Sequence, residues 1–125
     1  MRRVLSCLTV VAASFLFSNP ASGQTLTITG PCPGVKTLTV SGVTPNGRVF
    51  ILRAFGTGSA VIPFGLVCAG TTLGLNNTAV LVGIIPSDPF GNATTSTFVP
   101  AWGCGNVFVQ AFDGMTCLTT NVVPI

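Results

Sequence analysis

Short segments of alternating apolar and β-branched residues, separated by turn residues, run through most of this chain. The first such segment, residues 25–29, reads Thr-Leu-Thr-Ile-Thr, and this alternation is typical of a β-strand with one buried face. Groups rich in Gly, Pro, Asn and Asp interrupt the apolar segments roughly every 8 to 14 residues. No segment after residue 23 has apolar residues at helical spacing. The pattern predicts an all-β fold.

The segments between these turns predict seven or eight short strands in an antiparallel β-sandwich with the proportions of immunoglobulin or fibronectin type III domains. The predicted strands cover residues 25–29, 35–43, 48–55, 59–62, 78–85, 93–99, 106–112 and 116–123. Residues 48–55 are apolar on both faces, so we expect a central strand, paired with residues 35–43 through the Pro-Asn-Gly turn. The dipeptide Asp113-Gly114 predicts a closing hairpin.

The first 23 residues have the organisation of a secretory signal peptide. Two arginines precede an uncharged apolar segment at residues 4–17, and small residues at positions 21 and 23 suit a peptidase cut after Gly23. The alternative is a membrane anchor, but a helix needs about 20 apolar residues to span a bilayer, and this segment is shorter. We expect residues 1–23 to be removed, and residues 24–125 to form one secreted domain without a membrane span, located outside the cell, at its surface or in a periplasm.

The expected mature domain has very few ionisable side chains. Its charged residues are Lys36, Arg48, Arg53, Asp88 and Asp113, whereas about a quarter of the residues in a typical soluble domain are charged. Three basic and two acidic residues give a net charge of +1. This charge argues against nucleic acid or an anionic membrane as a partner, because both are held mainly by clustered positive charge.

These few ionisable groups form no recognisable catalytic arrangement. The chain contains no His, so it lacks both the Ser-His-Asp and the Cys-His arrangement. Asp88 and Asp113 lie in separate turns, and we expect them to stabilise those turns rather than to act as a glycosidase pair. We expect Lys36 to be an exposed strand residue, and Arg48 and Arg53 to point to opposite faces of one strand. The sequence therefore predicts no enzyme, no catalytic residue and no cofactor.

Four cysteines lie in the expected mature domain, and Cys7 lies in the predicted signal peptide. An even number in a small secreted domain indicates two disulfides. Zinc is the alternative, but the chain has neither His nor a CxxC pair. Following the predicted strands up and down places Cys32 and Cys117 at one end of the sandwich and Cys68 and Cys104 at the other. Because bridged Cα atoms lie within about 7 Å, we expect the pairs Cys32–Cys117 and Cys68–Cys104.

Trp102 is the candidate ligand-contact residue, and it lies in a loop before a predicted strand. An exposed Trp stacks on a sugar or anchors a protein partner, whereas the alternative is a Trp that caps one end of the core. Phe64 and Phe90, also in loops, present the same two possibilities. The expected partner is a protein or a glycan at the cell surface. We expect a non-catalytic structural or interaction module, with a glycan-binding module and, more remotely, a small hydrolase as alternatives.

Several turn and cysteine landmarks stand out along the predicted mature domain, at residues 44–47, 56–58, 68–75, 109–113 and 117–123. They resemble a small module of exported proteins from environmental bacteria such as planctomycetes, where it often lies at the C-terminus of longer chains. The resemblance covers nearly all of residues 30–125, although this chain stands alone behind its own predicted signal peptide. It implies export and a β fold, and it implies no activity and no site residues.

Overall fold

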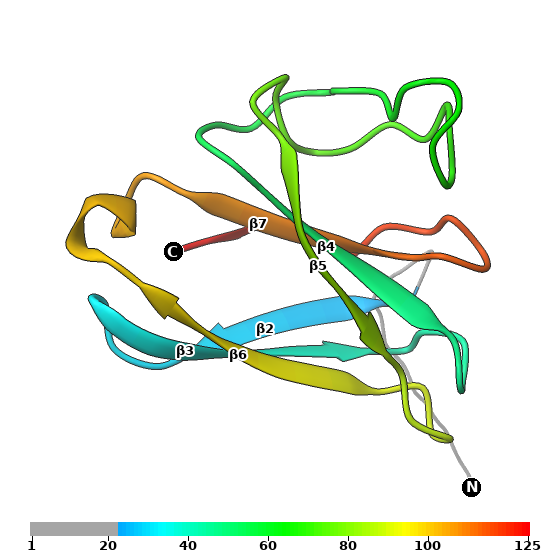
Figure 1. The fold of residues 1–125 in the computed structure, drawn as a ribbon, viewed down its shortest axis with the longest axis horizontal. Coiled ribbons are helices and arrows are strands. Elements are labelled where there is room, and N and C mark those ends of the chain that lie inside the picture. The colour runs from blue at the N-terminus through cyan, green and yellow to red at the C-terminus, as the bar shows by residue number, and fades with distance from the viewer. Residues whose placement is uncertain (1–22) are drawn as a thin grey trace, which may run out of the picture.

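The computed structural model describes residues 23–125, which form seven β-strands in two antiparallel sheets (Figure 1). The predicted signal peptide, except for Gly23, lies outside the described residues. One sheet has three strands in the order β2-β3-β6, and the other has four in the order β5-β4-β7-β8. The all-β, sandwich-like fold predicted from the sequence is confirmed. Within residues 23–125, no helix is long and apolar enough to cross a membrane.

The strand bounds follow the predicted segments closely at most positions. The three-stranded sheet consists of β2 (Thr25–Thr29), β3 (Gly34–Ser41) and β6 (Ala93–Val99). The four-stranded sheet consists of β5 (Val80–Pro86), β4 (Arg48–Ala54), β7 (Phe108–Asp113) and β8 (Val123–Pro124). A short 3-10 helix, η2 (Ala101–Gly103), connects β6 to β7.

The main core lies between the two sheets. Leu38 and Val40 of β3 and Val49 and Ile51 of β4 are almost completely buried there. Successive side chains of a strand point to opposite faces, so the threonines that alternate with the apolar residues of β3 are turned away from this core. The alternation in the sequence thus specifies which face of each strand is buried.

A second apolar cluster covers the outer face of the four-stranded sheet. Phe50 of β4 and Phe112 of β7 lie side by side with their ring centroids 4.9 Å apart. Leu73 and Leu75, from the long connection between β4 and β5, belong to the same buried cluster. Because β4 has a core on each side and lies between β5 and β7, the prediction of a central strand, apolar on both faces, is confirmed.

The connection between β4 and β5, residues 55–79, folds over the outer face of the sheet, and we call it the arm (Figure 1). The strand predicted at residues 59–62 does not form, and the arm contains only isolated β-bridges. Its two halves are joined by backbone hydrogen bonds: the Ala60 amide donates to the Leu75 carbonyl at 2.9 Å, and the Leu73 amide donates to the Ala60 carbonyl at 2.7 Å. The arm is therefore an ordered, irregular excursion rather than a strand of the sandwich.

One predicted strand pairing is wrong, and another forms only in part. Residues 35–43 and 48–55 were expected to form a hairpin, but β3 and β4 belong to different sheets, and residues 44–47 cross between them. The two apolar faces of β4 are buried in the two cores, and its two edges are hydrogen-bonded to β5 and β7. The expected closing hairpin is reduced to one isolated bridge, between Phe112 and Thr119, and the two-residue strand β8.

The structure contains two disulfides formed by the four predicted cysteines, but the predicted pairing of these cysteines is wrong. The bridges join Cys32 to Cys104 and Cys68 to Cys117, with Cα–Cα distances of 5.8 and 5.4 Å, instead of Cys32 to Cys117 and Cys68 to Cys104. The error comes from counting residues 59–62 as a full strand, which reversed the direction of every later strand.

The register of β4 and β5 shows where the reversal arises. The arm leaves β4 and returns to β5 at the same end of the sandwich, since Arg53 lies opposite Val80. β6 then runs back toward the end that holds Cys32, as the pairing of Gly34 with Val99 shows. Cys104 and Cys117 consequently lie at the ends opposite to those predicted, although they still occupy different ends of the molecule.

Candidate functional site

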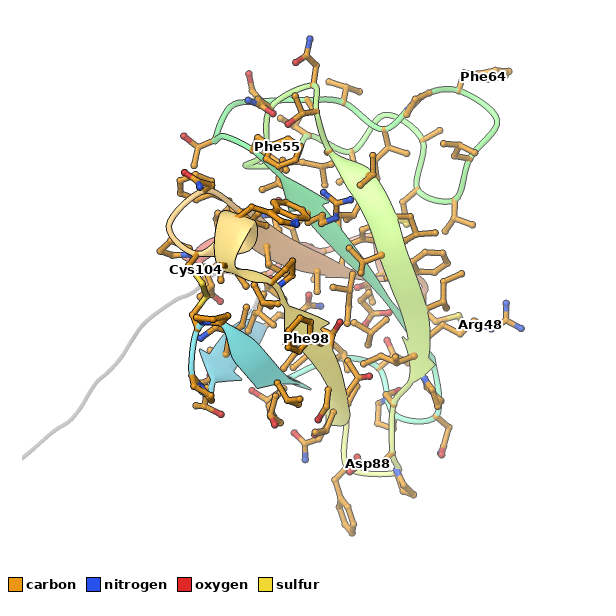
Figure 2. The ribbon with its side chains drawn as sticks, turned by 60° about the vertical axis from the view of Figure 1, so that its left-hand side comes forward. Arg48, Phe55, Phe64, Asp88, Phe98 and Cys104 are labelled. Carbon is orange, nitrogen blue, oxygen red and sulfur yellow. A yellow bond between two sulfur atoms is a disulfide. The ribbon has the colours of Figure 1, made fainter. Side chains whose placement is uncertain are left out.

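Three exposed aromatic side chains gather around one end of the sandwich. They are Phe55, directly after β4, Phe98 of β6 and Trp102 of η2, with exposed fractions of 52%, 64% and 58%. The rings of Phe55 and Trp102 are tilted relative to each other, with centroids 6.2 Å apart. Figure 2 shows Phe55 and Phe98 on the side of the molecule where η2 lies.

Arg53 adds a cationic group to these rings. Its guanidinium carbon lies 5.7 Å from the centroid of the Phe55 ring, which is within the range of a cation–π interaction. Arg48, at the opposite end of β4, extends away from the body of the protein (Figure 2). The spacing of the two arginines predicted that they would not form a shared site, and in the structure they lie apart, at opposite ends of β4. We refer to Arg53, Phe55, Phe98 and Trp102 together as the aromatic site.

A cavity of about 180 Å³ lies beside the aromatic site, between the two sheets. Arg53, Phe98 and Trp102 line it, together with Val82 of β5 and with core residues such as Ile51. β5 and β6 belong to different sheets and are not paired with each other. The cavity thus lies where the sandwich is not closed by a strand pair.

Local structure holds Trp102 in place. η2 begins after Pro100, and the side-chain amide of Asn106 donates a hydrogen bond to the Trp102 carbonyl at 2.8 Å. Two residues beyond Trp102, the disulfide between Cys104 and Cys32 fixes this segment to the connection between β2 and β3. Trp102 is therefore presented by an anchored turn.

Trp102 borders the core and is also accessible to a partner. It lines a cavity that reaches core residues, yet more than half of its surface is exposed. Phe64 and Phe90 are also highly exposed, but Phe64 lies in the arm, far from Phe98 in Figure 2. Neither Phe64 nor Phe90 lines the cavity beside Trp102.

The sequence alone did not indicate Arg53, Phe55 and Phe98 as partners of Trp102. Arg53 and Phe55 are two residues apart, so a strand places them on the same face. This spacing was the one sequence feature that could have indicated that they belong to one site. Phe98 lies in a Thr-rich strand that gave no sign of a binding site. Its position across the cavity from β5 depends on which strands share a sheet, and the sequence did not reveal this.

Asp113 is a buried carboxylate that connects two turns, with 1% of its surface exposed. Its Oδ2 accepts hydrogen bonds from the amide and the hydroxyl of Thr44, both at 2.7 Å, and its Oδ1 accepts one from the amide of Met115 at 2.8 Å. Burial opposes ionisation, but these hydrogen bonds outweigh it and lower the pKa of Asp113 below its ordinary value. As predicted, this carboxylate stabilises a turn, and it also holds the turn at Thr44, distant in sequence.

Asp88 stabilises the loop between β5 and β6. Its Oδ1 accepts hydrogen bonds from the backbone amides of Phe90 and Asn92, at 2.8 and 2.9 Å. Short polar side chains commonly bond to amides two residues ahead in this way. The prediction that Asp88 is a turn-forming residue is confirmed.

Lys36 lies in an unexpected environment, because the sequence interpretation placed it on the exposed side of a strand. Only 9% of its surface is exposed, and its Nζ donates a hydrogen bond to the Gly30 carbonyl at 2.7 Å. Lys36 is two residues before Leu38, so the strand alternation puts both on the buried face. The expectation is wrong because the alternation of buried side chains in β3 includes Lys36 as well as Leu38 and Val40.

Among residues 23–125, no cluster of three or more His, Cys, Asp or Glu side chains is placed to hold a metal ion. All four cysteines of this part are used in disulfides, which are typical of proteins that fold in an oxidising compartment. No protein-family model matches the chain, and no curated protein matches it significantly.

Proposed function

We propose that the protein is a secreted, non-catalytic interaction module that binds its partner through the aromatic site. The observation that carries this proposal is the cluster of Phe55, Phe98 and Trp102, each more than half exposed. Phe98 and Trp102 line one cavity, and the ring of Phe55 lies beside that of Trp102. Clustered apolar side chains on a surface mark interaction sites, and aromatic residues and Arg contribute much of the energy in protein interfaces.

Three observations support secretion, and the placement of the two carboxylates supports a non-catalytic role. The predicted signal peptide and the pair of disulfides fit an exported domain, and the resemblance to exported bacterial modules points the same way. Asp88 and Asp113 both accept hydrogen bonds that stabilise loops, and Asp113 is buried. These carboxylates are therefore poorly suited to act on a substrate.

A glycan is the second candidate partner, and the exposed ring of Trp102 favours it. The C–H face of a sugar packs well on a flat aromatic ring, and the adjacent guanidinium of Arg53 offers hydrogen-bond donors to hydroxyl or carboxylate groups. The cavity of about 180 Å³ is small, so we expect contact with a sugar edge or chain end rather than enclosure of a long polymer.

Binding of the purified mature protein to a glycan array and to protein components of the cell surface tests the proposal. Trp102→Ala should abolish binding, because it removes the largest ring of the site, and Phe98→Ala should weaken it. Phe90→Ala is the matched control, since Phe90 is an exposed aromatic residue outside the aromatic site. If the partner is a protein, protease treatment of the cell-surface components should abolish binding. If the partner is a glycan, the protein should bind on the glycan array.

Two results would contradict the proposal. Specific binding that is unchanged in both Trp102→Ala and Phe98→Ala would place the contact elsewhere. Turnover of a substrate that is lost in Asp88→Asn or Asp113→Asn, with the variant protein still folded, would show that the module is catalytic.

A further inference from the structure

A second, larger cavity lies on the other side of β4, between the arm and the outer face of the four-stranded sheet. Its volume is about 540 Å³, which falls within the range of roughly 300–1,000 Å³ found for small-molecule sites. None of its lining residues carries a charge, and the single polar side chain among them is that of Asn77.

The floor of this cavity is buried and its rim is apolar. Phe50, Phe112 and Leu73 form part of the lining and are almost completely buried. Val61 and Leu81 line the cavity from the arm and from β5, and each is more than half exposed. The cavity therefore presents a continuous hydrocarbon surface from solvent to the outer core of the sheet.

The arm is attached to the sheet at several points, and these attachments oppose collapse of the cavity. The disulfide between Cys68 and Cys117 ties the arm to the segment after β7. On the opposite branch of the arm, the Gly74 amide donates a hydrogen bond to Oε1 of Gln110, a buried residue of β7, at 2.8 Å. Closing the cavity would require breaking such contacts, which costs free energy.

The chemistry of the lining selects the class of ligand. An apolar cavity offers water few hydrogen-bond partners, so it stays poorly hydrated and favours apolar molecules. An ionised ligand would lose its hydration without gaining a counter-charge from the lining. The Asn77 amide can serve one hydrogen-bonding group, which suits a molecule with a single polar end.

We propose that this cavity binds a neutral molecule consisting mainly of hydrocarbon, with one polar group, of the class of a medium-chain alcohol. The site is separate from the aromatic site, because alternation along β4 sends Phe50 and Leu52 into one cavity and Ile51 and Arg53 into the other. The proposal therefore does not depend on the function assigned to Trp102.

Calorimetric titration of the mature protein with 1-octanol and with octanoate at pH 7 provides the test. The two probes have the same chain length but differ in charge, so we expect saturable binding of octanol and binding of octanoate weaker by about ten-fold or more. Methyl NMR signals of Leu52 and Leu81, which line the cavity, should shift on addition of octanol, while those of Leu118, which does not line it, should not.

A matched pair of substitutions in the arm locates the binding. Ala60 lines the cavity, whereas Ala69 is exposed and does not line it. Ala60→Leu should weaken octanol binding by about ten-fold because the added carbon atoms occupy the site, and Ala69→Leu should leave it unchanged. If Ala60→Leu fails to fold, Leu81→Ser at the rim should weaken binding relative to the exposed control Leu118→Ser.

Three outcomes would overturn the proposal. The first is the absence of saturable octanol binding in a protein whose NMR spectrum shows it folded. The second is equal affinity for octanol and octanoate, which would show that the uncharged lining does not discriminate against an ionised ligand. The third is unchanged affinity in both Ala60→Leu and Leu81→Ser, which would place the ligand outside this cavity.

Discussion

At the scale of single residues, Asp113 joins parts of the chain that local sequence does not connect. Its carboxylate accepts hydrogen bonds from Thr44, which lies 69 residues earlier, and from Met115, in its own turn. A buried carboxylate with several donors is stabilised in its ionised form. The side chain therefore fixes the crossover between the two sheets relative to the turn that follows β7.

Replacing Asp113 by Asn should destabilise the protein by about 2 kcal/mol. An Asn side chain has one acceptor oxygen and one NH₂ group, so it cannot accept from both the Thr44 and the Met115 donors. Chemical denaturation at pH 7 measures the loss. Asp88→Asn is the control and should cost much less, because a single oxygen, Oδ1, accepts both hydrogen bonds there. Equal losses in the two variants would contradict this role of Asp113.

The stability of the protein should also fall in acid, and Asp113 should cause much of the decrease. Its pKa is lowered in the folded state, so between the two pKa values the folded state binds fewer protons than the unfolded state. The stabilisation is complete above the unfolded-state pKa of about 3.9 and is lost as the pH falls through the lower folded-state pKa. Denaturation curves between pH 7 and pH 2 should show this slope in Asp88→Asn and a smaller one in Asp113→Asn.

At the scale of elements, the arm and the four-stranded sheet depend on each other. The arm contributes Leu73 and Leu75 to the cluster over Phe50 and Phe112, and it has isolated bridges but no strand. The order of the arm relies on the backbone hydrogen bonds between its two halves, on this packing and on the Cys68–Cys117 bridge. An element of this kind opens more easily than a central strand.

Removing each disulfide separately should have distinguishable effects. The double variant Cys68→Ser/Cys117→Ser should lose about 3 kcal/mol of stability and show faster amide exchange at Ala60 and Leu73, whose amides pair the two halves of the arm. The double variant Cys32→Ser/Cys104→Ser should lose a similar amount but leave exchange in the arm slow. Peptide mapping without reduction checks the native pairs, and recovery of Cys32–Cys117 would contradict the structure.

At the scale of the whole molecule, β4 organises two cores and two cavities. Its side chains alternate between the space shared with the three-stranded sheet and the space beneath the arm. Few charges lie on this framework, so polar but uncharged side chains supply most of its hydration. Packing, hydrogen bonds and disulfides therefore stabilise the part of the chain that the structure describes.

This balance predicts a stability that hardly depends on salt. Raising sodium chloride from a low to a moderate concentration screens interactions between charges, but residues 24–125 contain only five charged side chains. The unfolding free energy at pH 7 should change by less than about 0.5 kcal/mol. Thermal and chemical denaturation across a salt series measures it, and a large change would reveal an electrostatic contribution that the structure does not explain.

Local features of the fold were predictable from the sequence. Residues 25–29 and 93–99 form strands with the predicted bounds, and β4 is central because both of its faces are apolar. These properties depend on side-chain alternation and on turn residues, which act over a few positions. The use of Cys32, Cys68, Cys104 and Cys117 in two disulfides likewise followed from their even number in a small domain that follows a predicted signal peptide.

Only the tertiary structure decided which distant elements meet. The disulfide partners, the separation of β3 and β4 into different sheets, and the meeting of Phe98 with Trp102 depend on strand direction and sheet membership. One misassigned strand, at residues 59–62, was enough to reverse the predicted positions of Cys104 and Cys117. Strand formation is encoded by neighbouring residues, whereas the choice of partners depends on packing across the whole chain.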